Sequence, residues 1–272
     1  MKEAPRSIGK KGQVTIFVIL AIVIVVLGVL IYLFFPGIKT TATSVEENPV
    51  AYFQSCVQGN LSANVETVSL QGGSMNPSSS VVYMGNKIAY LCYTNQPYTE
   101  SPTIMCVPQV AFLVSSIESQ LKQSMAATVH NCFSQMKQDY TSKGYTDVNL
   151  QEGDFNVNLL PNKVVLHSNT QLTLTKGSQK YYDSFDVVLN NNLFELASLA
   201  STIVGWEETY GNADPVYFMN YYPDLNITKN VLSDWTKVWI IQERSTGDKF
   251  EFAVRSINWP LGIPKPSNQT AQ

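Results

Sequence analysis

The longest run of apolar residues lies near the start of the chain, from Ile16 to Phe35. It contains no charged residue, no proline and a single glycine. A helix of about 20 apolar residues spans the hydrocarbon core of a bilayer, which is roughly 30 Å thick. Lipid offers no hydrogen-bond partner to an open backbone, so a helix is the expected form. The pattern therefore predicts a transmembrane helix over residues 13–35.

Charges around this run predict its orientation. Four cations lie before it and few follow closely. Basic flanks stay in the cytoplasm, so residues 1–12 are expected to be a cytoplasmic basic leader. Since no second apolar run of this length occurs in the sequence, we expect a single-pass protein of the cell membrane. Its C-terminal domain would be extracellular, and the lipid bilayer would be its first partner.

Beyond a linker at 36–48, apolar residues recur every three or four positions in three segments, as they do in amphipathic helices. These helices are expected over 49–70, 109–140 and 191–210. Elsewhere apolar and polar residues alternate, which is typical of half-buried strands. Strands are expected at 80–84, 88–93, 155–160, 163–174, 180–189, 235–243 and 249–257.

These elements predict an α+β fold class. After the N-terminal transmembrane helix, residues 49–259 would form an extracytoplasmic domain of antiparallel strands packed with about three amphipathic helices. The last two strands form a hairpin around 245–248. The tail at 260–272 contains three prolines and is expected to be disordered.

The junction before the apolar run has a recognisable pattern. A basic residue precedes Gly12, and Gln13 opens the apolar helix. This resembles the class III, type IV pilin-like signal of archaeal surface proteins, which implies cleavage by a prepilin-type peptidase between Gly12 and Gln13. Many pilins carry a glutamate at the fifth mature position, where this chain has Phe17. A cleaved secretory signal and a plain signal anchor are the alternatives.

A second resemblance lies further along the chain. Cys56 falls on a predicted helix that ends at Leu70-Gln71-Gly72-Gly73, and a later predicted helix holds another cysteine. This arrangement is similar to uncharacterised archaeal single-pass surface proteins. It implies the same topology and no activity.

Four cysteines lie on the predicted outer side, where oxidising conditions favour disulfides. Four cysteines allow three connectivities. We favour Cys92–Cys106, which closes a short loop, and Cys56–Cys132, because both sulfurs lie on the apolar stripes of their predicted helices. No Cys-x-x-Cys pair occurs and the chain has two histidines, so neither zinc nor another cofactor is expected.

Composition narrows the possible partners. Charged residues make up 14% of the chain and the formal net charge is −3. Nucleic-acid binding needs a basic face, so this class of function is not expected. Three Asn-x-Ser/Thr triplets, at Asn60, Asn226 and Asn268, are candidate glycosylation sites of a surface glycoprotein.

Candidate catalytic groups are weak. Ser119 and Lys122 have Ser-x-x-Lys spacing, but they fall in the middle of a predicted helix. His130 and His167 show no triad spacing, and Glu207 and Glu208 are adjacent on a helix and so point in different directions. No catalytic residue is predicted, and we do not expect an enzyme.

Aromatic residues concentrate in the C-terminal third, and exposed aromatic rings bind sugars and peptides. The candidate binding aromatics are Trp206, Tyr217, Tyr221, Tyr222, Trp235 and Trp239. Trp235 and Trp239 are four residues apart in a predicted strand, which places both on one face, where core packing competes with ligand binding.

The sequence thus predicts a membrane-anchored cell-surface protein with a binding or structural role. Its partner would be a surface glycan or protein. The first alternative is a minor pilin-like subunit that packs with other pilin-like subunits in a filament. A surface hydrolase is the third hypothesis.

Overall fold

The computed structural model describes residues 48–96 and 103–258, together with Leu20 and Val23. The chain divides into two units, Met1–Glu47 and Asn48–Gln272. The predicted leader, the cleavage site at Gly12-Gln13, nearly all of the linker and the 260–272 tail lie outside the described residues.

The predicted fold class must be corrected in its membrane part. None of the helices in the described ranges is long and apolar enough to cross a bilayer. The segment for which a transmembrane helix was predicted, 13–35, lies outside the described residues except for Leu20 and Val23. The fold that the structure supports is therefore an α+β domain without a membrane-spanning helix among its described elements.

The first element of the second unit is helix α3, Pro49–Leu70, with the predicted bounds. Asn48 caps it, since its side-chain oxygen accepts a hydrogen bond from the Val50 amide at 3.0 Å. One stripe of the helix is buried, as its apolar spacing predicts: Phe53, Val57, Leu61, Val65 and Val68. The helix stops before Gly72 and Gly73, which both adopt positive φ.

Helix α4, Leu113–Ser142, packs against α3. The two helices are antiparallel, because Tyr52 donates a hydrogen bond to Asp139 while Asn64 donates one to Ser124. The helix begins later than the predicted residue 109. The reason is that strand β4, Val107–Pro108, pairs with strand β2, Asn86–Tyr93, and Gln109 donates its amide to the Leu91 carbonyl.

Two disulfides link the chain in the pairs predicted from the sequence. Cys56–Cys132 joins α3 to α4 across 76 residues. Cys92–Cys106 joins β2 to the residue just before β4 across 14 residues. Close to the first disulfide, the rings of Phe53 and Phe133 stack at 4.7 Å, so the covalent link lies within a packed interface.

Six strands between α4 and the next helix form two small antiparallel sheets, β5-β8-β9 and β6-β7-β10. The strands are β5 (Asp147–Gln151), β6 (Phe155–Leu160), β7 (Lys163–Ser168), β8 (Gln171–Lys176), β9 (Ser178–Tyr182) and β10 (Phe185–Asn190). The strands predicted at 163–174 and 180–189 are each broken in two, and β5 was not predicted.

Polar contacts explain the break between β7 and β8. Asn169 donates its amide to the Asp154 carbonyl, and the buried hydroxyls of Ser168 and Thr170 lie 2.9 Å apart. The Thr170 hydroxyl also accepts the Gly153 amide at 3.2 Å. These hydrogen bonds replace the backbone pairing of a continuous strand. The alternation of apolar and polar residues runs on across 163–174, so it did not indicate the break between β7 and β8.

The remaining strands form a larger sheet in the order β1-β2-β13-β12-β11. They are β1 (Ser80–Tyr83), β2 (Asn86–Tyr93), β11 (Leu225–Val231), β12 (Thr236–Glu243) and β13 (Lys249–Arg255), with a small pair of β3 (Thr103–Ile104) and β14 (Ile257–Asn258) beside it. Strands β2 and β13 run parallel, so the sheet is mixed rather than purely antiparallel as predicted.

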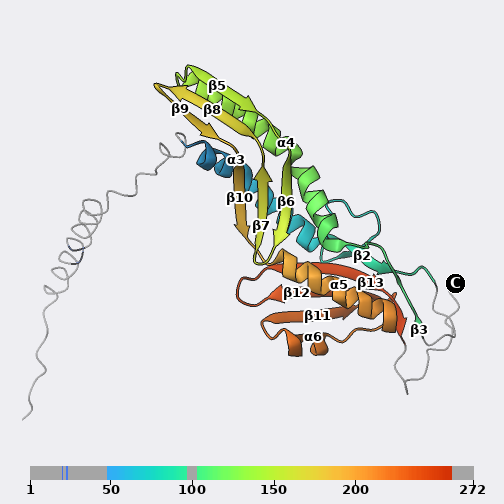
Figure 1. Ribbon diagram of the computed structural model, residues 1–272. Helices are drawn as coiled ribbons and strands as arrows, with labels where there is room; N and C mark the ends of the chain where they lie inside the picture. Colours follow the sequence, from blue (N-terminus) through green and yellow to red (C-terminus); the bar gives the residue numbers. More distant parts are fainter. Residues whose placement is uncertain (1–19, 21–22, 24–47, 97–102, 259–272) are drawn as a thin grey trace, which may run out of the picture. The chain divides into compact units, whose positions relative to one another are not determined.

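Two further helices accompany this sheet. Helix α5, Leu193–Tyr210, contacts β13, β12 and β2, and helix α6, Pro215–Tyr221, contacts β11 (Figure 1). The second unit thus has four helices within its described residues, where about three were predicted. Helix α6 was missed because residues 212–230 are rich in Tyr and Pro, although Asp214-Pro215 is a helix-start signal. A large hydrophobic core joins α3, α4, α5 and one face of the strands, and a smaller cluster of Ile88, Tyr90, Val238 and Ala253 lies apart from it on the larger sheet.

The two disulfides should differ in their contribution to stability. In the loop-entropy account, the longer Cys56–Cys132 link contributes about 4 kcal/mol and the shorter Cys92–Cys106 link about 3 kcal/mol. Replacing both cysteines of each pair by alanine and measuring urea unfolding should show the larger loss for Cys56/Cys132. An equal or reversed order would contradict this assignment.

The break in the strands should depend on Gly153. A Cβ at this position would lie 2.5 Å from the Asn169 carbonyl oxygen. Gly153→Ala should therefore lower the free energy of unfolding by about 1–3 kcal/mol. Gly59→Ala is the matched control, because open space surrounds Gly59 on helix α3. This change should be neutral or stabilise by up to about 1 kcal/mol.

Candidate functional site

Aromatic rings from α5 and α6 form a contiguous surface. Trp206 contacts Tyr210 at 5.3 Å between ring centroids and Tyr217 at 4.8 Å, and Tyr217 contacts Tyr221 at 5.0 Å. We call these four residues the α5–α6 aromatic surface. Trp206 is half-buried, whereas Tyr210, Tyr217 and Tyr221 are 57%, 40% and 67% exposed. Such rings offer large contact area at little cost in side-chain entropy.

Local sequence explains how the rings come together. Helix α5 ends at Gly211, which adopts a φ of 70° and lets the chain turn back. The side chain of Asp214 then accepts the Val216 amide at 2.9 Å and caps α6. Phe218 is buried against Trp206 and holds α6 on the core, so Tyr217 lies beside Trp206 and Tyr221 beside Tyr217.

A buried ion pair lies beneath the turn between the two helices. The ammonium of Lys237 is 2.5 Å from Glu207 Oε2, 2.5 Å from the Gly211 carbonyl and 2.9 Å from Ser256 Oγ. Ser256 in turn donates to Glu207 Oε2 at 2.7 Å. The Ala213 amide donates to the other carboxylate oxygen of Glu207 at 3.2 Å. The pair therefore ties the end of α5 and its turn to β12.

This network is better suited to structure than to catalysis. Burial lowers the pKa of Lys237, although the neighbouring Glu207 carboxylate opposes this effect. A serine beside a lysine of lowered pKa is the arrangement of a Ser–Lys nucleophile. Ser256 and Glu207 are both 0% exposed, however, so a substrate has no access to the hydroxyl.

A pocket adjoins the aromatic surface. It has a volume of about 460 Å³, within the usual range for small-ligand sites, and Tyr221 and Tyr222 are among its lining residues. We call it the α5–α6 pocket. Phe194 and Leu199 from α5 also line it. The pocket thus brings apolar and polar side chains together next to the exposed rings of Tyr221 and Tyr222.

Glu195 supplies a notable polar group in this pocket. Its Oε1 accepts the Asn162 amide at 2.8 Å. Its Oε2 is buried and has no hydrogen-bond partner among the described residues. Buried acceptors are normally satisfied, and an orphan one requires an explanation. Glu195 was missed by sequence reasoning because a glutamate in the first turn of a helix is ordinary.

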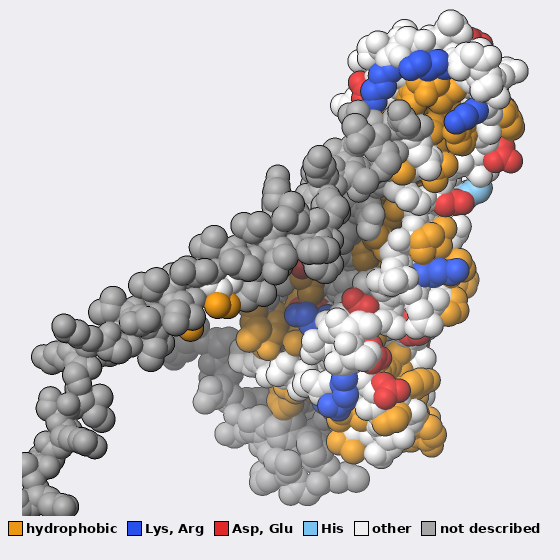
Figure 2. Space-filling model, turned by 90° about the vertical axis from the view of Figure 1, so that its left-hand side faces the viewer, with side chains coloured by type: hydrophobic (Ala, Val, Ile, Leu, Met, Phe, Trp, Pro, Cys, Tyr) orange, Lys and Arg blue, Asp and Glu red, His pale blue; other side chains and the backbone are white. Residues whose placement is uncertain are grey.

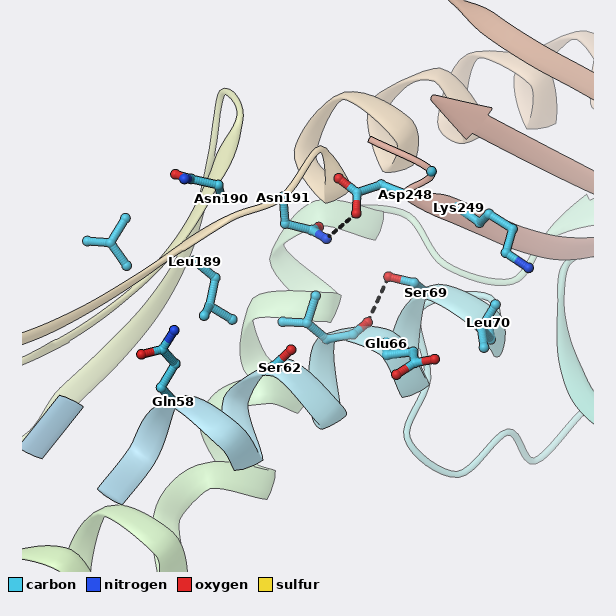
Figure 3. A pocket seen from close by; sticks show the side chains of 13 residues that line it. Gln58, Ser62, Glu66, Ser69, Leu70, Leu189, Asn190, Asn191, Asp248 and Lys249 are labelled. Atoms are coloured by element: carbon cyan, nitrogen blue, oxygen red, sulfur yellow. Dashed lines mark hydrogen bonds between the residues drawn. The ribbon is translucent and has the colours of Figure 1, made fainter. Parts of the chain in front are cut away.

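A second pocket, of about 510 Å³, lies between α3, the end of β10 and the turn between β12 and β13. Figure 3 shows Gln58, Ser62 and Glu66 of α3 on one side of it and Asn190 and Asn191 on the other. Asn191 donates to Asp248, and Ser69 donates to the Val65 carbonyl within its own helix. Its described lining has no aromatic residue, so it offers less to an organic ligand than the α5–α6 pocket does.

The predicted aromatics separate into two groups. Trp206, Tyr217, Tyr221 and Tyr222 lie on the surface, and Tyr222 is 50% exposed. The prediction for Trp235 and Trp239 was wrong in its geometry. Trp235 has a φ of 68° and precedes β12, so it is not part of a strand. Trp239 is fully buried against Phe252, which removes it from any binding surface.

Tyr210 is the aromatic that sequence reasoning missed. It lies four residues after Trp206, at helical spacing, on a helix whose other apolar side chains are mostly buried. The i to i+4 spacing was the available signal, because residues four apart share a helix face.

The weak catalytic candidates are not brought together. Ser119 is exposed, and Lys122 instead pairs with Asp154 at 2.9 Å. His130 pairs with Glu152 at 2.9 Å. Glu207 is buried and Glu208 exposed, so the two do point in different directions as predicted.

His167 also lies in a local pair. The Asp186 carboxylate lies 2.5 Å from its ring, and this contact raises the pKa of His167. In the described part of the chain, no group of three or more His, Cys, Asp or Glu side chains is placed to hold a metal ion.

The predicted glycosylation sites are accessible where they are described. Asn60 and Asn226 are both exposed, and Asn268 lies outside the described residues. Figure 2 shows a face on which uncharged side chains predominate, while basic side chains gather near the upper end. This surface accords with the low charged fraction of 14%.

Comparison with known proteins gives no match: no protein-family model, no curated protein and no solved structure is significantly similar to the chain. The resemblance to archaeal class III signals and surface proteins therefore stays a prediction.

The buried ion pair should show strong coupling. Glu207→Gln or Lys237→Met alone should lower the free energy of unfolding by about 3–5 kcal/mol, because each leaves a buried group without its partner. The double variant should lose clearly less than the sum, as measured by urea unfolding. Lys249→Met is the control, since Lys249 is 42% exposed and should cost about 0–1 kcal/mol. Additive losses for Glu207 and Lys237 would contradict the coupling.

Proposed function

We propose that this chain is a protein of the cell exterior that binds a ligand through the α5–α6 aromatic surface and the adjoining pocket. The observation that carries the proposal is a series of ring contacts that runs from the exposed Tyr210 through Trp206 and Tyr217 to the exposed Tyr221. Contiguous exposed aromatic groups on a folded protein mark interaction sites, because leaving them in water has no benefit for folding.

Two further features support an exterior location. Both cysteine pairs are disulfides, and stable structural disulfides are typical of secreted and surface proteins. Asn60 and Asn226 are exposed within Asn-x-Ser/Thr triplets, so they are available for glycosylation. A binding role fits this location better than catalysis, because the best-formed polar network, around Lys237, is closed to solvent.

Binding to intact cells tests the proposal. The purified, fluorescently labelled chain is incubated with cells of the organism that makes it, and the bound fraction is measured after sedimentation. We expect saturable binding. The Tyr217→Ala/Tyr221→Ala variant should bind about tenfold or more weakly, because each lost aromatic contact costs about 0.5–1.5 kcal/mol.

The matched control is Tyr181→Ala on strand β9, where the tyrosine is 60% exposed and distant in sequence from the site. Its binding should equal that of the unaltered chain. Equal binding by the double variant, with an unchanged unfolding curve, would remove the aromatic surface from the proposed function.

A further inference from the structure

We propose that the α5–α6 pocket binds a neutral oligosaccharide, with one sugar ring in the pocket and the neighbouring rings on the aromatic surface. This inference rests on the proposed function and adds the class of ligand. It draws on three independent observations: the charge of the pocket lining, the orphan oxygen of Glu195 and the arrangement of the tyrosines.

The charged groups of the lining are acidic. Glu195, Asp224 and Glu243 line the pocket, and no Lys, Arg or His is among its described lining residues. Phosphorylated, sulfated or carboxylated ligands would meet like charge here, and such juxtaposition strongly disfavours binding. The pocket therefore selects a neutral or a cationic ligand.

Neutral hydrogen-bonding side chains complete the lining. Asn162, Asn192, Ser198 and Thr202 bring amides and hydroxyls to the pocket. Asn192 donates to Asn162, and the hydroxyls of Ser198 and Thr202 donate to carbonyls of α5. Each hydroxyl oxygen can still accept a further hydrogen bond, which matches a ligand that donates through several hydroxyls.

The orphan oxygen of Glu195 identifies a donor position in the ligand. Glu195 Oε1 is fixed by the Asn162 amide, so the carboxylate is held in one orientation and Oε2 stays buried without a described partner. Glu195 lines the pocket, but Oε2 itself is buried, so a ligand hydroxyl reaches it only when a lining side chain moves. The hydrogen bond that the hydroxyl then donates to Oε2 is charge-assisted and stronger than one between neutral groups. Binding would thus give this buried acceptor a partner.

The tyrosines supply the apolar half of sugar recognition. A pyranose ring has an apolar face of C–H groups and a rim of hydroxyls, so it stacks on an aromatic ring while its rim forms hydrogen bonds. Tyr221 and Tyr222 line the pocket, and Tyr221 also contacts Tyr217 on the aromatic surface. The contact series from Tyr221 through Tyr217 to Trp206 gives further sugar units a place to stack, which favours an oligomer over a monosaccharide.

Titration with defined sugars tests the inference. The probes are hexamers of β-1,4-linked glucose, β-1,4-linked N-acetylglucosamine and α-1,6-linked mannose, each added to the full chain in a calorimeter up to millimolar concentration. We expect at least one hexamer to bind, its monosaccharide to bind at least tenfold more weakly, and a sulfated hexamer not to bind. Choline and pentalysine are the cationic probes, and we expect neither to compete.

Variants locate the binding. Glu195→Gln keeps the shape of the side chain but replaces a charged acceptor with a neutral one. It should weaken binding of the hexamer about tenfold. Tyr221→Ala should do the same. Glu208→Gln is the matched control, because Glu208 is an exposed glutamate near the opposite end of α5. It should leave the affinity unchanged.

The outcomes separate the two proposals. If no hexamer binds while the chain still binds cells through Tyr217 and Tyr221, the oligosaccharide inference fails and the proposed function stands. If a cationic probe binds in the hexamers' place, the inference also fails. Hexamer binding that Glu195→Gln and Tyr221→Ala both leave unchanged would overturn the assignment to this pocket. If the unaltered chain binds neither cells nor any hexamer, the proposed function fails as well.

Discussion

The candidate site depends on the buried ion pair of Lys237 and Glu207. An ammonium group has three N–H donors, and that of Lys237 meets three acceptors, one each from Glu207, Gly211 and Ser256. Such complete pairing is what makes a buried charge tolerable. Because these partners come from α5, the turn after it and the end of the sheet, the pair fixes where α5 stops and where α6 starts. The positions of the exposed aromatic rings depend on this junction between α5 and α6.

Much of the fold follows from local patterns in the sequence. The buried stripe of α3 and the hairpin of β12 and β13 could be read from spacing alone, because amphipathic periodicity reports which side of an element is covered. The pairing of Cys56 with Cys132 could be inferred for the same reason, since each sulfur belongs to an apolar stripe. These features need only neighbours along the chain for their prediction.

The rest depends on contacts that are distant in sequence. The parallel pairing of β2 with β13 brings together strands from opposite ends of the domain, and no local pattern encodes it. The break between β7 and β8 depends on Gly153 and Asp154, which precede it by many residues. In the candidate site, aromatic composition indicated Trp206 and Tyr217 but could not separate them from the buried Trp239. Whether a tryptophan side chain is buried depends on how the sheet packs. Glu195 Oε2 is buried, without a described hydrogen-bond partner, only when α5 is packed in the folded domain.

The position of the Cys56–Cys132 bond has a mechanical consequence. Cys56 lies about two helical turns into α3, close to its beginning at Pro49. Tension applied to the chain ahead of this helix would reach the covalent bond after those turns had unwound. It would then pass into α4 instead of extending the remainder of α3. The bond would therefore shield residues 57–131 from the tension, with strands β1 and β2 among them, while the elements after Cys132 would remain on its path.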